Sequence, residues 1–242
     1  MRNYTFKPGW VASISTLLLI PLFLSLGAWQ LRRAEEKIAL MELRRVHEQD
    51  PPMRLTGAQG DAEPLRYRRV QVEGDYDPAH QFLLDNQLQE NRVGYHVLTP
   101  LQIRGAGVAV LVNRGWVPQG ASRAELPDLA LSQQAPHVSG RVEKFPSVGF
   151  KLEGAEIPAP GWPSLVQVAD AEQLSRRLGY RVLPYQVLLD SDQRDGYVRD
   201  WHPASLDPGK NRGYALQWFS FAALVAALYV WYGFKPRPVA GA

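Results

Sequence analysis

Two long segments without a charged residue, one toward each end of the chain, constrain the fold more than any other feature. They are Val11–Leu31 and Gly213–Phe234. A helix needs roughly 20 apolar residues, at about 1.5 Å of rise each, to cross the hydrocarbon core of a bilayer. Both segments reach that length, so the sequence predicts two transmembrane helices with both chain ends on the same side.

Aromatic residues support these boundaries. Trp10 and Trp29 flank the first segment, and Trp218, Trp231 and Tyr232 flank the second. Such rings favour the headgroup level of a membrane. The predicted organisation is a tail (1–10), a first transmembrane helix (11–31), an extramembrane domain (32–212), a second transmembrane helix (213–234) and a second tail (235–242).

Two alternatives stay open for these segments. The first segment also resembles a cleaved secretory signal, because Arg2 and Lys7 precede it and Ser25 and Gly27 offer a cleavage spacing. However, its apolar run exceeds the usual signal core of roughly 7–15 residues, and bulky Trp29 follows, which favours a retained anchor. Either segment is also compatible with a buried core helix, although two charge-free core helices at the two ends of one soluble domain would be unusual.

The charged residues lie almost entirely between the two segments. All 24 acidic and 23 of the 27 basic residues are there, so this part has a net charge of −1 while the whole chain has +3. The remaining basic residues stand beside the predicted spans, where they indicate a lipid boundary rather than a nucleic-acid surface. Charge counting does not set the orientation, because long domains translocate largely regardless of such charges.

The part between the segments is predicted to be mainly β. The first helix continues past Leu31 and stops at Pro51-Pro52, since the intervening residues are strong helix formers. One short helix, DAEQLSRRLG, has Asp170 as a cap and Gly179 at its end. We expect an antiparallel sandwich or a partly open barrel. The predicted strands lie in YRRVQVEGDY, QFLLDNQ, GYHVLTPLQI, VAVLVNRGWV, HVSGRVEKF, SLVQVAD, YQVLLD and YVRDW.

No motif predicts an enzyme or a metal site. The absence of cysteine excludes disulfides, thiolate metal sites and a cysteine nucleophile. Neither His-Glu-x-x-His nor Gly-x-Ser-x-Gly occurs. The five histidines are His47, His80, His96, His137 and His202. No two of them have the spacing of metal ligands.

Three stretches carry a family resemblance. The first is LGAWQLRRAEEK, where Gly27, Trp29, Gln30 and Arg33 stand as the chain leaves the first span; the second runs from YRRVQVEGDYD through GYHVLTPL to VLVNRGWVP; the third is GYALQWFSFA at the start of the second span. In this order and spacing they resemble the Surfeit locus protein 1 family of cytochrome c oxidase assembly factors, over nearly the whole chain.

The resemblance implies a non-enzymatic protein of the bacterial inner membrane, with both termini cytoplasmic and the β-rich domain periplasmic. It implies a role in maturing the catalytic subunit of haem-copper oxidase while haem a enters. Bacterial relatives are associated with haem a through a histidine that lies three residues before a tyrosine. In this chain Tyr214 resembles that tyrosine, and Asn211 stands at the position of the histidine. Asparagine lacks the imidazole nitrogen that haem iron accepts. The haem vicinity is therefore expected at Asn211, Tyr214 and His202, with haem a held transiently or not at all.

Several residues are expected to contact a partner. Glutamine and tryptophan beside the spans suit a helix pair or a partner-facing surface, because amides in a bilayer bond across helices. In NRGWVP, an arginine and a tryptophan look exposed, and both types are enriched at protein contacts. The predicted contact residues are Gly27, Trp29, Gln30, Arg33, Asn113, Arg114, Gly115, Trp116, Gln217 and Trp218.

Two other function classes stay open. One is a membrane-anchored scaffold of another envelope complex. The other is a haem-binding or haem-modifying protein that uses histidines of the outer domain, which would require His47, His80, His96 or His202 to cluster.

Overall fold

A computed structural model describes residues 4–120, 126–131, 137–146, 149, 153–201 and 207–236. The chain forms two compact units. The helical unit combines Met1–Glu42 with Pro203–Ala242, and the β unit is the continuous stretch Leu43–His202.

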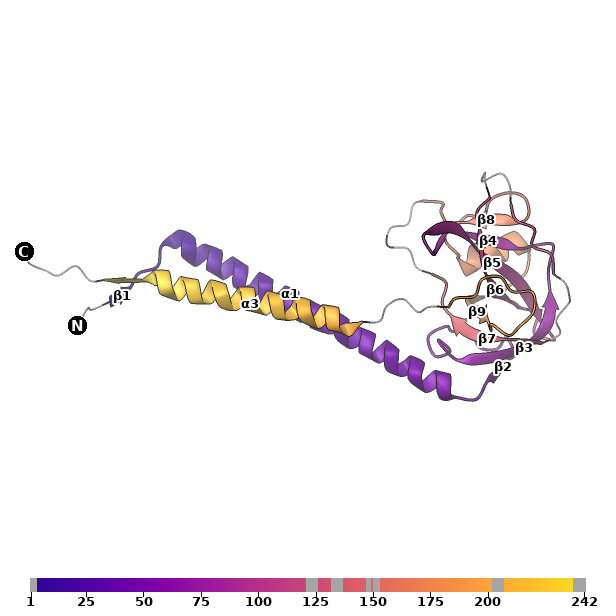
Figure 1. The fold of residues 1–242 in the computed structure, drawn as a ribbon, viewed down its shortest axis with the longest axis horizontal. Coiled ribbons are helices and arrows are strands. Elements are labelled where there is room, and N and C mark those ends of the chain that lie inside the picture. Colours follow the sequence, from indigo (N-terminus) through magenta and orange to yellow (C-terminus); the bar gives the residue numbers. More distant parts are fainter. Residues whose placement is uncertain are drawn as a thin grey trace, which may run out of the picture. The chain divides into compact units, whose positions relative to one another are not determined.

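The helical unit contains two long helices that lie side by side (Figure 1). Helix α1 spans Trp10–Gln49 and helix α3 spans Pro208–Gly233. The prediction that α1 continues past Leu31 and ends before Pro51 is confirmed. Its 40 residues rise about 60 Å, roughly twice the hydrocarbon thickness of a bilayer.

Helix α3 begins before the charge-free segment. Asp207 caps it by accepting a 2.8 Å hydrogen bond from the Gly209 N–H, and Pro208 occupies the first turn. Proline is tolerated there because the N–H it lacks would have no partner in the helix.

Both helices leave most of their apolar surface uncovered. Only 6% and 11% of the most apolar stretches of α1 and α3 are buried. Leu17 is 73% exposed and Leu224 is 55% exposed. A core helix of a soluble domain would be mostly covered, so this exposure does not fit that alternative. Each helix is long and apolar enough to cross a membrane.

Short strands join the ends of the helical unit. Strand β1 (Tyr4–Phe6) precedes α1, strand β10 (Phe234–Pro236) follows α3, and the two pair antiparallel.

The β unit is one sheet of eight strands in the order β2-β3-β7-β9-β6-β5-β4-β8. A further pairing of β3 with β5 closes a partial barrel. At this closure Gly74 is required, because a Cβ there would lie 2.2 Å from the Gln102 carbonyl oxygen. The strands are β2 (Met53–Leu55), β3 (Arg69–Tyr76), β4 (Phe82–Gln89), β5 (Arg92–Ile103), β6 (Ala109–Pro118), β7 (His137–Glu143), β8 (Ser164–Val166) and β9 (Val182–Leu189).

The structure selects between the predicted β architectures. The barrel alternative is confirmed in its partial form, but a purely antiparallel sheet is wrong, since β2–β3, β4–β8 and β6–β9 are parallel pairs. Parallel neighbours need a long crossover, and the chain between β6 and β9, which includes helix α2 (Ala171–Leu178), supplies one. The predicted strand YVRDW is reduced to a single bridge between Val198 and Trp116.

The residues at the two ends of α2 were sufficient to predict where this helix begins and ends. The Asp170 carboxylate accepts a 3.0 Å hydrogen bond from the Gln173 N–H, and Gly179 ends the helix with a φ of 78°. Both predicted ends are therefore confirmed.

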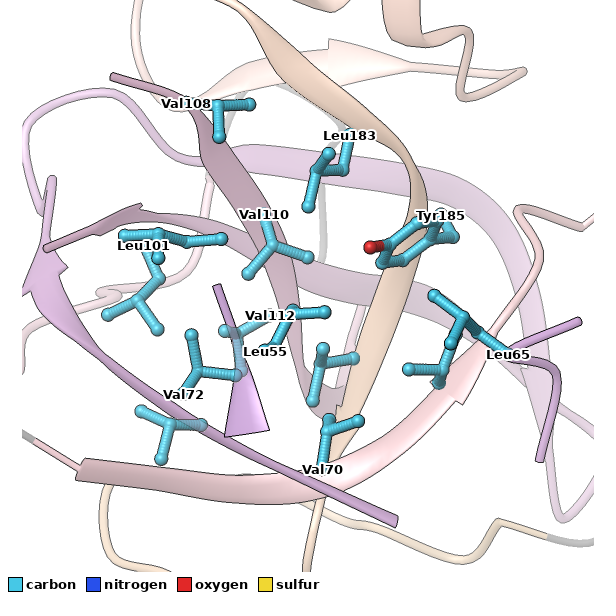
Figure 2. Packing of buried hydrophobic residues seen from close by; sticks show 14 of the residues in the cluster. Leu55, Leu65, Val70, Val72, Leu101, Val108, Val110, Val112, Leu183 and Tyr185 are labelled. Atoms are coloured by element: carbon cyan, nitrogen blue, oxygen red, sulfur yellow. The ribbon is translucent and has the colours of Figure 1, made fainter. Parts of the chain in front are cut away.

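The main core fills the barrel interior (Figure 2). Strand β3 shows the pattern that builds it: Val70 and Val72 point inward while Arg69 and Gln71 point to solvent. Strand β6 is different, because its residues are buried on both faces. The polar part of NRGWVP is therefore inside the protein, where Asn113 and Arg114 are each 1% exposed.

Candidate functional site

Gln30 and Trp218, two of the predicted contact residues, lie where α1 and α3 pack together. The Asn211 Nδ2 amide donates a 2.6 Å hydrogen bond to Gln30 Oε1. Toward the other end of the helices, the Trp218 ring stacks on Phe23, with centroids 5.7 Å apart and planes at 26°. We call the contact between Asn211 and Gln30 the amide site.

Small residues let the helices approach closely beside the amide site. Gly27 is buried, and a Cβ on it would lie 2.5 Å from the Phe219 ring. Ala34, Ala215 and Ala222 are also buried. Small residues at such contacts allow the backbone-level packing that holds helices together in lipid.

A polar layer lies next to the amide site, toward the C-terminal end of α1. The Lys37 ammonium donates a 3.1 Å hydrogen bond to the Asp207 carbonyl oxygen. Arg33 forms a 2.7 Å ion pair with Glu36 on the same helix, and both side chains are more than half exposed. Arg33 therefore remains available at the surface, whereas Lys37 links the helices.

Three predicted residues point away from the helix pair. Trp29 is 47% and Tyr214 is 55% exposed. Gln217 is exposed, and within the described residues its amide has no hydrogen-bond partner. The phase of α3 explains this, because Ala215 faces α1 and a residue two positions later points roughly 200° away. The polar partner of α1 is therefore Asn211 rather than Gln217.

The amide site does not fit a haem ligand. An asparagine amide has no basic nitrogen for iron, and the Asn211 amide is already bonded to Gln30. Neither charge-free segment contains histidine, methionine or cysteine. The Tyr214 phenol points outward, and His202 lies outside the described residues.

The interpretation of Arg114 as an exposed contact residue is wrong. It is 1% exposed. Its guanidinium donates to Asp195 O at 2.7 Å, Gln81 Oε1 at 3.0 Å, Leu129 O at 3.2 Å and Ala130 O at 3.3 Å. Arg114 therefore fastens two surface segments to the barrel.

Burial lowers the pKa of the Arg114 guanidinium, although Tyr197, Tyr76 and Asp195 oppose this effect. The Tyr197 ring lies 5.0 Å from the guanidinium carbon, in a cation–π arrangement. These contacts offset part of the free-energy cost of burying the charged Arg114 guanidinium.

The other members of NRGWVP are also structural. Asn113 donates a 3.0 Å bond to Gln186 Oε1 and accepts one from the Gly115 N–H at 3.1 Å. Gly115 has a φ of 115°, which favours glycine. Trp116 is 5% exposed and donates from Nε1 to Gln87 O at 2.9 Å. The predicted Arg114–Trp116 contact surface is thus part of the interior.

The described histidines do not gather. His80 Nδ1 lies 2.8 Å from Asp77 Oδ2, His47 Nδ1 lies 2.6 Å from the Arg66 carbonyl oxygen, and the His96 ring packs edge-on against Trp201. Among the described residues no group of three or more histidine, aspartate or glutamate side chains could hold a metal ion. The cluster that a histidine-based haem site would require is not formed there.

Sequence reasoning missed several residues of these sites. Phe219 and Phe23 complete the helix contact, and Gln81 and Leu129 complete the Arg114 network. The spacing of Phe23, Gly27 and Gln30 at helical intervals of four and three was an available signal for one face of α1.

Replacing Asn211 with leucine is expected to weaken the helix pair by about 0.6–2 kcal/mol, the usual range for a hydrogen bond between helices in lipid. Unfolding of the full chain by increasing dodecyl sulfate in mixed micelles, followed by far-UV circular dichroism, measures this. Gln217→Leu is the matched control on the same helix, and it should leave the transition unchanged. Equal shifts for both variants would contradict the assignment of Asn211 as the interhelical partner.

The comparisons with known proteins cover both helices and the β unit. The sequence model of the SURF1 family matches residues 17–223. An uncharacterised SURF1-like protein of Mycobacterium bovis is 28% identical over 229 residues, which are 91% of this chain and 82% of that protein. Surfeit locus protein 1 of Xenopus tropicalis is 32% identical over 143 residues, which are 52% of this chain and 45% of the frog protein. A SURF1-like protein of Caenorhabditis elegans is 31% identical over 133 residues, which are 45% of this chain and 41% of the worm protein.

The match thus spans about half the length of these animal relatives. It includes the amide site, since Gln30 and Asn211 both lie within residues 17–223. The family match and the two apolar helices around a mainly β unit agree with each other, and the chain belongs to the SURF1 family.

Proposed function

We propose that this protein is a membrane-anchored, non-enzymatic assembly factor for cytochrome c oxidase. It is held in the bacterial inner membrane by α1 and α3, with both termini in the cytoplasm and the β unit in the periplasm. The observation that carries the proposal is a pair of apolar, largely uncovered helices in a SURF1 family chain, joined by Asn211 and Gln30.

The contacts between α1 and α3 support membrane anchoring by a retained first helix. They run from the Ser13 hydroxyl, 3.0 Å from the Tyr229 hydroxyl, to the amide site at Gln30 and Asn211. A signal peptide that is removed needs no such fitted partner. The exposed apolar faces of both helices are suited to lipid.

The outward residues near the amide site support a partner within the membrane. Trp29, Tyr214 and Gln217 are exposed there, and an amide facing hydrocarbon is stabilised by a hydrogen bond from another helix. We assign this surface to a transmembrane helix of the oxidase catalytic subunit. NRGWVP instead supports the β unit from inside, through the Arg114 network.

In this function the protein acts when haem a enters the catalytic subunit. Asn211 does not ligate the haem iron. The Asn211–Gln30 bond serves the helix pair. The protein then acts by holding the immature subunit, and this reading favours the assembly factor over a haem carrier.

The test is a deletion strain without a second homologue, complemented with tagged wild-type or variant chain. Deletion should abolish the oxidase absorbance and activity, and the tagged chain should co-purify with the catalytic subunit. Gln217→Leu should reduce this co-purification severalfold, whereas Ser220→Ala, an exposed change on the same helix, should not. Normal oxidase in the deletion strain would sink the proposal, and capture of a different envelope complex would favour the scaffold alternative.

A further inference from the structure

The residues just before α1 and just after α3 pair in a small β structure. We call it the terminal clasp and define it as residues 4–7 and 233–236. Thr5 pairs with Lys235 and Phe6 with Phe234. The Lys7 N–H extends the pairing with a 2.7 Å hydrogen bond to the Gly233 carbonyl oxygen. Backbone groups near hydrocarbon must find partners within the protein, and the clasp provides them.

The terminal clasp is packed onto the helix ends. Phe6 occupies the space beside Gly233, where a Cβ would lie 2.2 Å from its ring. The same ring meets Tyr229 and Phe234 edge-on, at centroid distances of 5.7 and 5.3 Å. These contacts make the clasp a fitted structure rather than a pair of loose tails.

The position of the terminal clasp along α1 matches a membrane boundary. From Trp10 to Gln30 the helix rises about 30 Å, which is the hydrocarbon thickness of a typical bilayer. The amide site and the clasp therefore lie at opposite boundaries. Beside the clasp, Trp10 and Trp231 are each 76% exposed and Tyr232 is 73% exposed, as expected for rings at the headgroup level.

The charge of the terminal clasp is entirely positive. Lys7 and Lys235 are both exposed and stand on its two strands or their continuation. The described stretches 4–31 and 208–236 contain no aspartate or glutamate, so neither ammonium group has a carboxylate near it along these helices. Ammonium groups at headgroup level attract lipid phosphates.

We propose that the terminal clasp binds the headgroups of anionic phospholipids through Lys7 and Lys235. The inference rests on the membrane anchoring in the proposed function, but not on the oxidase. The pairing of β1 with β10 holds Lys7 and Lys235, which carry the ammonium groups, close to each other. The exposed aromatic rings beside the clasp set the depth of these ammonium groups at the level of the lipid phosphates. The clasp thereby selects lipid composition as well as position.

The experiment uses the full chain in nanodiscs of phosphatidylcholine and phosphatidylglycerol, with native mass spectrometry to count the lipids that stay bound. Wild type should retain phosphatidylglycerol preferentially. The double variant K7Q/K235Q should lower this enrichment at least about tenfold, because each basic residue near an anionic surface contributes roughly fivefold.

Two controls separate a built site from general charge attraction. Lys210→Gln removes an exposed positive charge at the other end of α3 and should lower the enrichment far less than K7Q/K235Q does. Gly233→Ala keeps every charge but displaces Phe6, so it should reduce the enrichment. An equal loss for Lys210→Gln, or full retention in K7Q/K235Q, would overturn the inference. Failure of the wild-type chain to enter nanodiscs would instead refute the membrane anchoring itself.

Discussion

Replacing Arg114 with methionine is expected to lower the free energy of unfolding of the β unit by about 3–5 kcal/mol. Methionine fills part of the volume but donates no hydrogen bond. The carbonyl oxygens of Asp195 and Leu129 and the amide oxygen of Gln81 would each lose a buried donor. Urea unfolding of the full chain in mild detergent, followed by tryptophan fluorescence, measures the change.

Arg104→Met is the matched control in the same unit. Arg104 is 55% exposed and lies 3.7 Å from the Asp75 carboxylate, a pair worth roughly 0–1 kcal/mol. A small effect of Arg114→Met combined with lost co-purification of oxidase would contradict the structural role and restore the contact role predicted from sequence.

Acidification from pH 7 to pH 4 is expected to destabilise the β unit by about 3 kcal/mol through His96. Burial lowers the pKa of His96 from 6.5 to about 4. Its Nδ1 atom is buried and has no hydrogen-bond partner within the described residues. The unfolded chain binds a proton near pH 6.5, whereas the folded chain resists it until about pH 4. Stability therefore falls as the pH drops through this window.

The measurement is the urea midpoint of the full chain at several pH values between 7 and 4. His96→Leu should remove most of this slope, since leucine has no proton to bind. His137→Gln, a change at a side chain that is 72% exposed, should leave the slope as in wild type. An acid slope that persists undiminished in His96→Leu would assign it to other groups.

The local features of the fold could be predicted, because their causes lie within a few residues. The runs around Val70 and Val112 alternate or cluster apolar side chains, and both became strands of the core. Asp170 and Gly179 have the chemistry of helix caps, and they cap α2. The prediction of a long first helix rested on residues with high helix propensity.

The errors come from pairings between distant residues. NRGWVP looks like an exposed strand end, yet Gln81, Leu129 and Asp195 enclose the Arg114 side chain, which is 1% exposed. Nothing near residue 114 in the chain indicates these contacts, because Gln81, Leu129 and Asp195 are 33, 15 and 81 positions away in the sequence. The parallel pairs were missed for the same reason.

The helix pair was predicted in part. Gln30 was expected to bond across the helices and does so, but its partner is Asn211 rather than Gln217. Hydropathy locates a span without fixing its rotation, and that rotation follows from how Gly27 and Phe219 fit together. The orientation of outward residues therefore required the packed structure.

The order of synthesis determines when the helix pair can form. The β unit is one continuous stretch that leaves the ribosome before α3 does. During that interval Gln30 and Gly27 of α1 lack Asn211 and Phe219, which they contact in the finished helix pair. A chain released before α3 would therefore carry the β unit on a helix α1 whose Gln30 amide lacks the hydrogen bond from Asn211.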